Sequence, residues 1–314
     1  MRLVLSSALL AAFWFAVANV IASAIAWVAA RVIDARGRND AGLLVAIRLM
    51  PAAAAIFFAT ALFLPAHWLY EPAESEEAFG VAMSVLAAFG AALMMRSAWR
   101  ALTVVSQDLR VASLTRRSAT PLDAGAYQVR GLHGVSLAGV LRPTILVGSA
   151  AVEALTPAEL DAAIAHEIAH QRSRDNLKRF LMHCAPDLFG WSAAARRIEQ
   201  AWQAESECEA DARAVRGDER RAVVLASALV KVARLTRRPG VIVPSPAWSA
   251  FHVPTLLETR VARLVSGRLD AARGFRSVWC GIAAAAFGVP AAVWTLNLAY
   301  PLHLVTEALV SRLP

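Results

Sequence analysis

Long stretches without a charged side chain occur near the beginning of the chain and again near its end. Four runs lack Asp, Glu, Lys and Arg altogether: Leu3–Ala30, Leu49–Tyr70, Ala78–Met95 and Ser277–Thr306. Each run reaches the roughly 18–20 residues that a helix needs to cross about 30 Å of hydrocarbon. The pattern therefore predicts four transmembrane helices, the first three over about residues 3–30, 43–66 and 78–95.

The first run has one alternative interpretation, a secretory signal peptide with a cleavage site at residues 22–24 (Ala-Ser-Ala). A signal peptide has an apolar core of about 7–15 residues. The run continues through Ile25, Ala26 and Trp27, so we expect it to remain as a membrane span.

The composition agrees with a membrane protein. Hydrophobic residues make up 58% and charged residues 18% of the chain, whereas soluble domains have about 45–50% and about 25%. Three cysteines are too few for a disulfide framework, and the apolar content excludes a disordered chain.

Arginines beside the spans set the expected orientation. These are Arg31, Arg36, Arg38, Arg96 and Arg100. The loop 71–77 between the second and third spans has glutamates and no Lys or Arg. Because positive loops stay in the cytoplasm, we expect both termini outside and residues 96–276 inside, at a bacterial inner membrane. Arg48, near the cytoplasmic start of the second span, is expected to extend its side chain toward the interface.

The segment between the third and fourth spans has a mixed pattern, which predicts an α+β cytoplasmic domain over residues 99–275. The expected strands are Tyr127–Leu132, Gly134–Ala138 and Thr144–Gly148, and the expected helices include residues 193–216, 220–237 and 256–266. Thr156, Pro157 and Glu159 have capping-box spacing, so another helix is expected from there to about Arg172. The chain would then divide into residues 1–98, 99–275 and 276–314.

Most of the excess positive charge lies in this cytoplasmic part. Residues 96–276 contain 26 basic and 17 acidic residues. Such a surface is expected to lie against the anionic inner leaflet of the bilayer. Nucleic-acid binding is not expected, because neither a recognition helix nor a set of stacking aromatic residues accompanies the charge.

The capped helix carries the main chemical signal, His166-Glu167-Ile168-Ala169-His170. Residues four apart share a helix face, so His166 and His170 can bind one metal ion while Glu167 acts on a water molecule. A catalytic zinc site needs a third protein ligand. The position six residues after His170 is Asn176 rather than histidine, so the ligand is sought among the acids downstream.

Those acids form two pairs on the helix predicted over residues 193–216. Glu207 and Asp211 share one face, which lets Glu207 bind the metal while Asp211 orients a ligating histidine. Glu205 and Glu209 share another face that we expect to be solvated; either would be the alternative ligand if Glu207 is not.

Four stretches follow one another in a recognisable order: residues 139–147, 166–176, the Glu207/Asp211 pair and 258–264. With three spans before them and one after, they resemble the BlaR/MecR-type membrane metallopeptidases and, more distantly, the HtpX and CAAX prenyl protease group. The resemblance implies a gluzincin-like fold with one Zn²⁺ per chain and Glu207 as the third ligand. Asp175, within the second stretch, is expected to support the ligands together with Asp211.

The length and composition of the interval between His170 and Glu207 distinguish BlaR/MecR-type enzymes from HtpX-like enzymes. HtpX-like enzymes place two membrane helices there, and two spans need about 40 apolar residues. The interval has 36 residues and contains many charges, so the BlaR/MecR-type layout fits better. The chain ends at Pro314 without the penicillin-binding sensor of antibiotic-sensing members, so β-lactam sensing is not expected.

The expected activity is zinc-dependent endopeptidase cleavage of a protein or peptide, either a cytoplasmic repressor or the protein itself. The substrate would extend along the strand formed by Thr144, Ile145, Leu146, Val147 and Gly148. His252 and Arg260 are two open candidates for the donor that stabilises the oxyanion.

Three functions other than zinc-dependent cleavage of a repressor or of the protein itself could be assigned to such a sequence. An HtpX-like quality-control protease and a catalytically idle membrane scaffold or signal transducer are the alternatives, although a structural metal site would not need Glu167. A transporter is disfavoured, because the spans contain few ionisable residues. The sequence leaves the substrate and the oligomeric state open.

Overall fold

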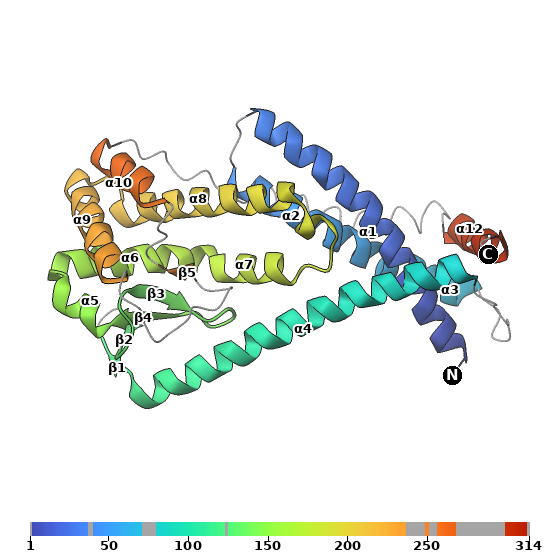
Figure 1. The fold of residues 1–314 in the computed structure, drawn as a ribbon, viewed down its shortest axis with the longest axis horizontal. Coiled ribbons are helices and arrows are strands. Elements are labelled where there is room, and N and C mark those ends of the chain that lie inside the picture. Colours follow the sequence, from blue (N-terminus) through green and yellow to red (C-terminus); the bar gives the residue numbers. More distant parts are fainter. Residues whose placement is uncertain are drawn as a thin grey trace. The chain divides into compact units, whose positions relative to one another are not determined.

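The computed structural model describes residues 2–36, 40–70, 80–122, 125–236, 249–250, 256–267 and 299–312. Figure 1 follows the helices and strands in chain order. The chain divides into two compact units. The first unit comprises Met1–Trp99, Ala185–Glu199 and Gly274–Pro314, and the second comprises Arg100–Cys184 and Gln200–Arg273.

Long apolar helices make up most of the first unit. They are α1 (Arg2–Arg36), α2 (Ala41–Phe57) with a π-helical turn at Phe58–Phe63, α3 (Leu64–Tyr70), the start of α4 (Val81–Ser118) and α12 (Ala299–Arg312). Three segments are long and apolar enough to cross a membrane: Leu5–Ala35, Ala41–Tyr70 and Val81–Ser113. The first three predicted spans agree with them. Most of the fourth predicted span lies outside the described residues, and α12 contains only its end.

The expectation that Arg48 extends toward the interface is wrong. Its side chain is 3% exposed and pairs with the fully buried Asp187, with 3.0 Å between Nη1 and Oδ2. Its Nε also lies 2.5 Å from Oε1 of Glu199. Arg48 turns inward because two carboxylates of residues 185–199 belong to the same unit and neutralise it.

Polar side chains of α1 satisfy the backbone of the segment that carries Asp187. Asn19 donates to the carbonyl of Pro186 at 2.8 Å and accepts from the amide of Leu188 at 3.1 Å. Ser23 accepts from the amide of Phe189 at 3.2 Å. Buried backbone groups need such partners, so this segment is anchored to α1 and α2 by hydrogen bonds and an ion pair.

The second unit contains a mixed sheet in the order β1-β2-β4-β3-β5. The strands are β1 (Thr120–Pro121), β2 (Ala126–Val129), β3 (Val135–Ala138), β4 (Thr144–Gly148) and β5 (Ser249–Ala250). β4 runs parallel to β2 and antiparallel to β3. The predicted β4 is therefore present, and it occupies the centre of the sheet.

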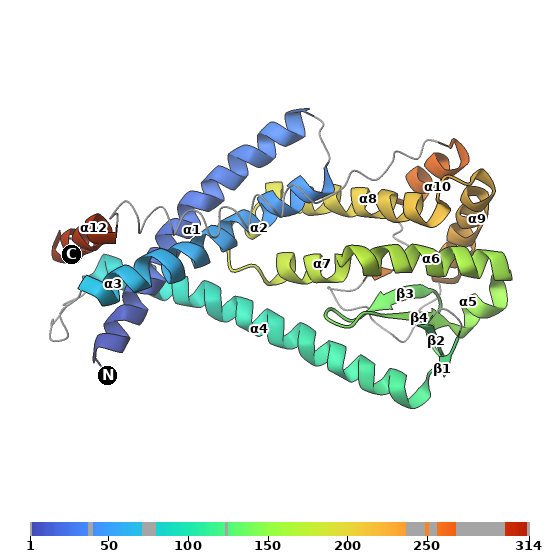
Figure 2. The same cartoon turned by 180° about the vertical axis from the view of Figure 1, so that it is seen from behind.

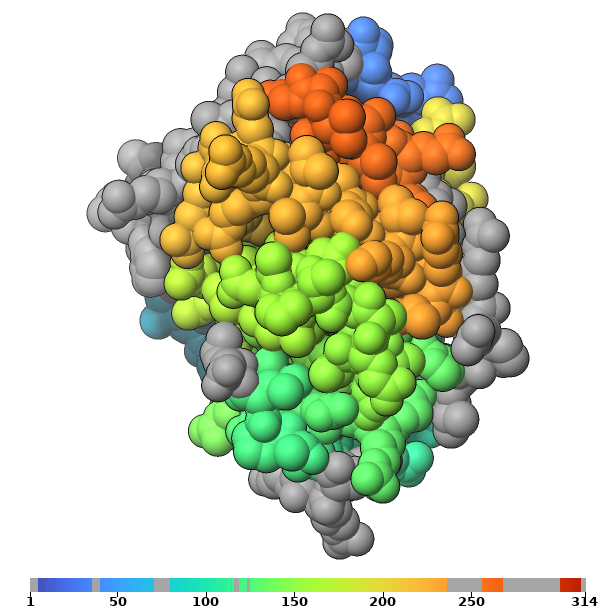
Figure 3. Space-filling model, turned by 90° about the vertical axis from the view of Figure 1, so that its left-hand side faces the viewer, coloured from blue at the N-terminus to red at the C-terminus, as the bar shows by residue number. Residues whose placement is uncertain are grey.

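Helices cover this sheet and build the core of the second unit. They are α5 (Ser149–Ala154), α6 (Pro157–Ser173), α7 (Asp175–Cys184), the later part of α8 (Ala193–Val215), α9 (Glu219–Thr236) and α10 (Leu257–Val265). α6 packs on β3 and β4, as Figure 2 shows, and α9 packs between α6 and α10 (Figure 3). Apolar side chains of these elements form one core that includes Leu137, Ile164 and Leu229.

The predicted capping box at the start of α6 is confirmed. The Thr156 hydroxyl accepts from the amide of Glu159 at 3.3 Å, and the Thr156 amide donates to Oε2 of Glu159 at 2.8 Å. The helix ends where Arg174 adopts a left-handed conformation with φ of 54°. These signals set the length of α6 and the face on which its histidines lie.

Candidate metal centre

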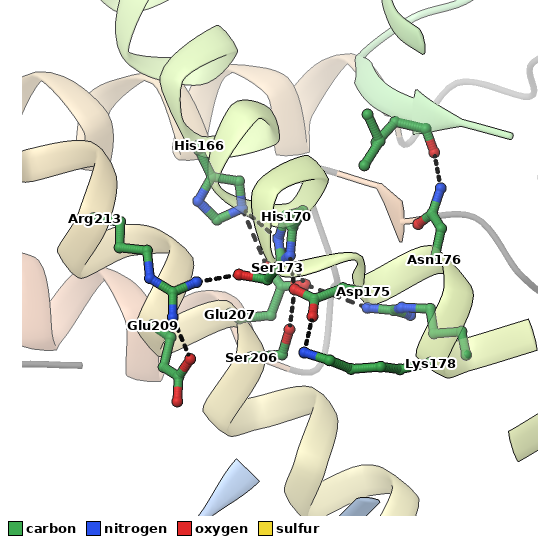
Figure 4. A network of polar contacts seen from close by, with 12 residues as sticks. His166, His170, Ser173, Asp175, Asn176, Lys178, Ser206, Glu207, Glu209 and Arg213 are labelled. Carbon is green, nitrogen blue, oxygen red and sulfur yellow. Dashed lines mark hydrogen bonds and ion pairs between the residues drawn. The ribbon is translucent and has the colours of Figure 1, made fainter. Parts of the chain in front are cut away.

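The two histidines of α6 and a glutamate of α8 meet inside the second unit (Figure 4). His166, Glu167, His170 and Glu207 are all 0% exposed. The Nε2 atoms of the histidines are 3.1 Å apart. Glu207 Oε2 lies 3.4 Å from Nε2 of His166, and Oε1 lies 3.7 Å from Nε2 of His170.

Carboxylates on the far side of each imidazole fix its orientation. Nδ1 of His166 lies 2.9 Å from Asp211 Oδ1, and Nδ1 of His170 lies 2.8 Å from Asp175 Oδ2. Because an ionised carboxylate only accepts, a neutral ring carries its proton on Nδ1 and presents a lone pair at Nε2. When both rings are neutral, as metal ligation requires, two lone pairs and the Glu207 carboxylate point at one another.

This donor set fits a metal ion. One ligand atom from each of His166, His170 and Glu207 lies within 4.8 Å of the others. Converging lone pairs repel unless a cation lies among them, and two imidazoles with one carboxylate are a usual set for catalytic zinc. The three residues can therefore hold a metal ion.

The comparison with protein families agrees with this site. Residues 133–267 match the model of peptidase family M48. The matched region contains α6, α7, α8 and α10 and supports a metallopeptidase. A search of curated proteins gives no match to the chain.

The acids of α8 lie as the helix periodicity predicts. Glu207 and Asp211 face the cluster, with 0% and 2% exposure. Glu205 and Glu209 are partly exposed, and Glu209 Oε2 accepts from Arg213 at 2.8 Å. The second unit thus brings Glu207 and Asp211 to the histidines and leaves Glu205 and Glu209 outside the cluster.

Asp175 links three helices of the second unit. Besides His170 of α6, it accepts hydrogen bonds from Lys178 of α7 at 2.7 Å and from the Ser206 hydroxyl of α8 at 2.9 Å (Figure 4). The sequence pattern did not predict α7 as a helix, and nothing local pointed to Lys178 or Ser206. Their role depends on contacts between helices that the periodicity of one helix does not show.

Arg260 of α10 is also part of the centre, with 2% exposure. Its Nε and Nη2 donate to the two carboxylate oxygens of Asp211 at 2.8 and 2.6 Å, and its Nη1 lies 2.9 Å from Glu207 Oε2. The guanidinium therefore faces the carboxylates of α8. The other candidate for the oxyanion, His252, lies outside the described residues.

The buried charges of the centre stabilise one another. Burial alone would lower the pKa of His170, but Glu207 and Asp175 raise it to about 10. Burial would raise the pKa of Glu207, yet Arg260 and His170 hold it well below its usual range. The pKa of Asp211 is likewise lowered, against burial, by Arg260 and His166. The carboxylates therefore remain ionised, as metal ligation requires.

The expectation that β4 binds the substrate along a free edge is wrong. β4 pairs with β2 over Ile145–Gly148 on one side and with β3 over Thr144–Val147 on the other. Ile145, Leu146, Val147 and Gly148 are buried, and only Thr144 is partly exposed. A strand with both edges paired has no backbone groups left for a peptide.

A cavity of about 350 Å³ opens beside the centre instead. Its lining includes Leu137 of β3, Pro143, His170, Gln171 and Asn176. Asn176 donates from Nδ2 to the carbonyls of Leu137 and Gly139 at 2.9 and 2.8 Å, so it holds the end of β3 beside α7. The cavity is therefore a recess of the second unit that reaches His170, a proposed metal ligand.

Proposed function

We propose that this protein is a membrane-embedded zinc endopeptidase that cleaves protein segments at the cytoplasmic face of the inner membrane. One observation carries the proposal: one ligand atom from each of His166, His170 and Glu207 lies within 4.8 Å of the others, with the buried Glu167 next to His166 in the chain. The apolar helices of the first unit and the M48 match support a membrane-associated peptidase.

Each residue of the centre has a distinct chemical role in this proposal. His166, His170 and Glu207 hold the zinc, which when bound acts as a Lewis acid and lowers the pKa of water. Glu167 accepts a proton from the attacking water and delivers it to the amide nitrogen of the scissile bond. The water oxygen first bonds to the carbonyl carbon, whose oxygen takes up the negative charge, and the carbon–nitrogen bond then breaks as the nitrogen receives the proton.

Asp175, Asp211 and Arg260 position these groups. The two aspartates keep the imidazole rings oriented through Nδ1. Arg260 makes a two-point contact with Asp211 and an ion pair with Glu207, which fixes both acids of α8. We therefore assign Arg260 to positioning the ligands rather than to binding the oxyanion.

The layout supports a BlaR/MecR-type enzyme over an HtpX-like one. The interval between His170 and Glu207 contains α7 and the start of α8, and the described residues there include no span candidate. On this proposal the substrate is a cytoplasmic repressor or the protein itself, cleaved in signalling. The cavity beside β3 and the α6–α7 turn would receive it.

The test uses the full-length protein in lipid nanodiscs. We expect one zinc per chain, chelator-sensitive cleavage of an unfolded fluorogenic protein, and recovery of activity with zinc. Glu167→Gln should keep zinc and lose about 10²–10⁴-fold in rate, because it removes the general base. His166→Ala and Glu207→Ala should lose zinc.

Glu209→Gln is the matched control, because Glu209 lies on the same helix outside the cluster. It should keep both zinc and activity. Full activity in Glu167→Gln would refute the mechanism. Zinc-loaded wild-type protein that cleaves neither substrates nor itself would indicate a scaffold.

A further inference from the structure

Arg179 is a cation beside the metal cluster whose donors are not all used. It lies four residues after Asp175, so both side chains lie on one face of α7. Its Nη2 is 3.7 Å from Glu207 Oε1, which is an ion-pair distance but too long for a hydrogen bond. Its Nε and Nη2 are buried, and no residue in the described part of the chain hydrogen-bonds to them.

Two residues of α8 position this guanidinium. Glu207 attracts it on one side, and its central carbon lies 5.3 Å from the ring centroid of Trp202. Trp202 and Glu207 are 2% and 0% exposed, so both are firmly packed. Two residues of α8 therefore hold the positive charge of Arg179 near Glu207, a proposed metal ligand.

The neighbouring cations are engaged by protein carboxylates. Arg260 bonds Asp211 and Glu207, and Lys178 donates to Oδ1 of Asp175 at 2.7 Å. Buried donors without an acceptor are unfavourable and are rare in folded proteins, so they call for a functional explanation. Nε and Nη2 of Arg179, near the Glu207 carboxylate, therefore have no acceptor within the described part of the chain. An acceptor from outside it can bind them.

We propose that Arg179 is a catalytic residue that binds the oxyanion of the scissile peptide; this rests on the proposed function. As water adds to the carbonyl carbon, the carbonyl oxygen gains a negative charge. Preorganised donors in a dry site stabilise that charge most strongly. The fixed guanidinium supplies such donors, and the charge is released again when the carbon–nitrogen bond breaks.

Kinetics of the zinc-loaded full-length protein test this role. Arg179→Met should lower kcat by about 10²–10³-fold, the usual effect of losing one oxyanion donor. KM and zinc content should stay near the wild-type values. Arg179→Lys should recover part of kcat, because it restores the charge without the two-pronged geometry. Arg213→Met, which alters a partly exposed arginine of α8, is the control and should change nothing.

Inhibitor binding gives a second readout that does not depend on turnover. A phosphinic peptide carries a tetrahedral anionic group that mimics the transition state. Its Kd should rise in Arg179→Met by a factor similar to the loss in kcat. A thiol peptide, which lacks that group, should bind both proteins equally.

Three results would overturn this assignment. Loss of zinc from Arg179→Met would mean that Arg179 only supports Glu207. Wild-type kcat in Arg179→Met, with a loss in His252→Ala, would assign the donor to His252 instead. Equal phosphinic binding in wild type and variant would also exclude it. By contrast, a zinc-loaded wild type without any activity would refute the proposed function itself.

Discussion

Removing one partner of the buried pair between Arg48 and Asp187 should strongly destabilise the first unit. Both side chains are nearly inaccessible, at 3% and 0% exposure, and 3.0 Å separates Nη1 and Oδ2. Arg48→Met removes one partner and leaves the other charge buried. Such a change costs about 3–5 kcal/mol, because the remaining charge is neither hydrated nor neutralised.

Glu199 adds little to this magnitude. Its side chain is 38% exposed, so its pair with Arg48 is partly screened by solvent. At about 2–4 °C per kcal/mol for a chain of this size, Arg48→Met should lower the melting temperature by about 6–20 °C. Thermal unfolding in one detergent, followed by tryptophan fluorescence, measures the shift.

Two further variants separate the charge from the packing. Arg48→Met combined with Asp187→Leu removes both charges, and it should recover much of the loss, since an apolar replacement of a buried pair is often neutral. Arg197→Ala is the control, because Arg197 and Asp34 form a pair that is 73% and 69% exposed. If Arg48→Met melts at the same temperature as wild type, breaking the buried ion pair does not destabilise the first unit.

Three more predictions concern the metal centre, pH and topology. Asp175→Asn should weaken zinc binding by about 10–100-fold in a chelator competition, because it removes the carboxylate that orients His170; Asp161→Asn, an exposed change on α6, should not. Burial would raise the pKa of Glu159, but Lys231, Ser227 and Thr156 lower it from 4.5 to about 2. Its ionised form therefore stabilises the fold above pH 4.5 and loses this effect as the pH falls toward 2. The melting temperatures of wild type and Glu159→Gln should differ at neutral pH and converge in acid. Ser75→Cys should react with an impermeant thiol reagent in intact cells while Ser118→Cys does not, and the reverse would contradict the orientation.

Local signals predicted the helices well. The capping box begins α6 where expected, and its periodicity puts His166 and His170 on one face. The same reasoning separated Glu207 and Asp211 from Glu205 and Glu209, because the two faces of one helix differ by residue spacing alone. Site residues whose positions depend on the spacing within one helix could therefore be predicted from the sequence.

Contacts between segments that are far apart in the sequence could not be predicted from helix periodicity and capping residues. β4 was expected to have a free edge, but strand order depends on β2 and β3 pairing with it from both sides. The buried partner of Arg48 lies 139 residues away along the chain. A charge near the end of a span looks the same in the sequence whether it reaches the interface or meets a carboxylate inside.

Residues 185–199, which carry Asp187, link the ion pair with Arg48 to the metal centre along the chain. Residues 185–199 belong to the first unit, α7 directly before them carries Asp175, and α8, which begins within them at Ala193, carries Glu207. Ser206 joins the two helices through its hydrogen bond to Asp175. We therefore expect a disturbance of this segment to affect Glu207 through α8 and Asp175 through α7.

Arg48→Met should consequently weaken zinc binding as well as lower the melting temperature. Zinc affinity is measured by chelator competition at a temperature where the variant is fully folded, so that unfolding does not contribute. The double variant with Asp187→Leu should restore affinity together with stability. If Arg48→Met melts early but binds zinc as tightly as wild type, the anchor stabilises the first unit alone and the metal centre is independent of it.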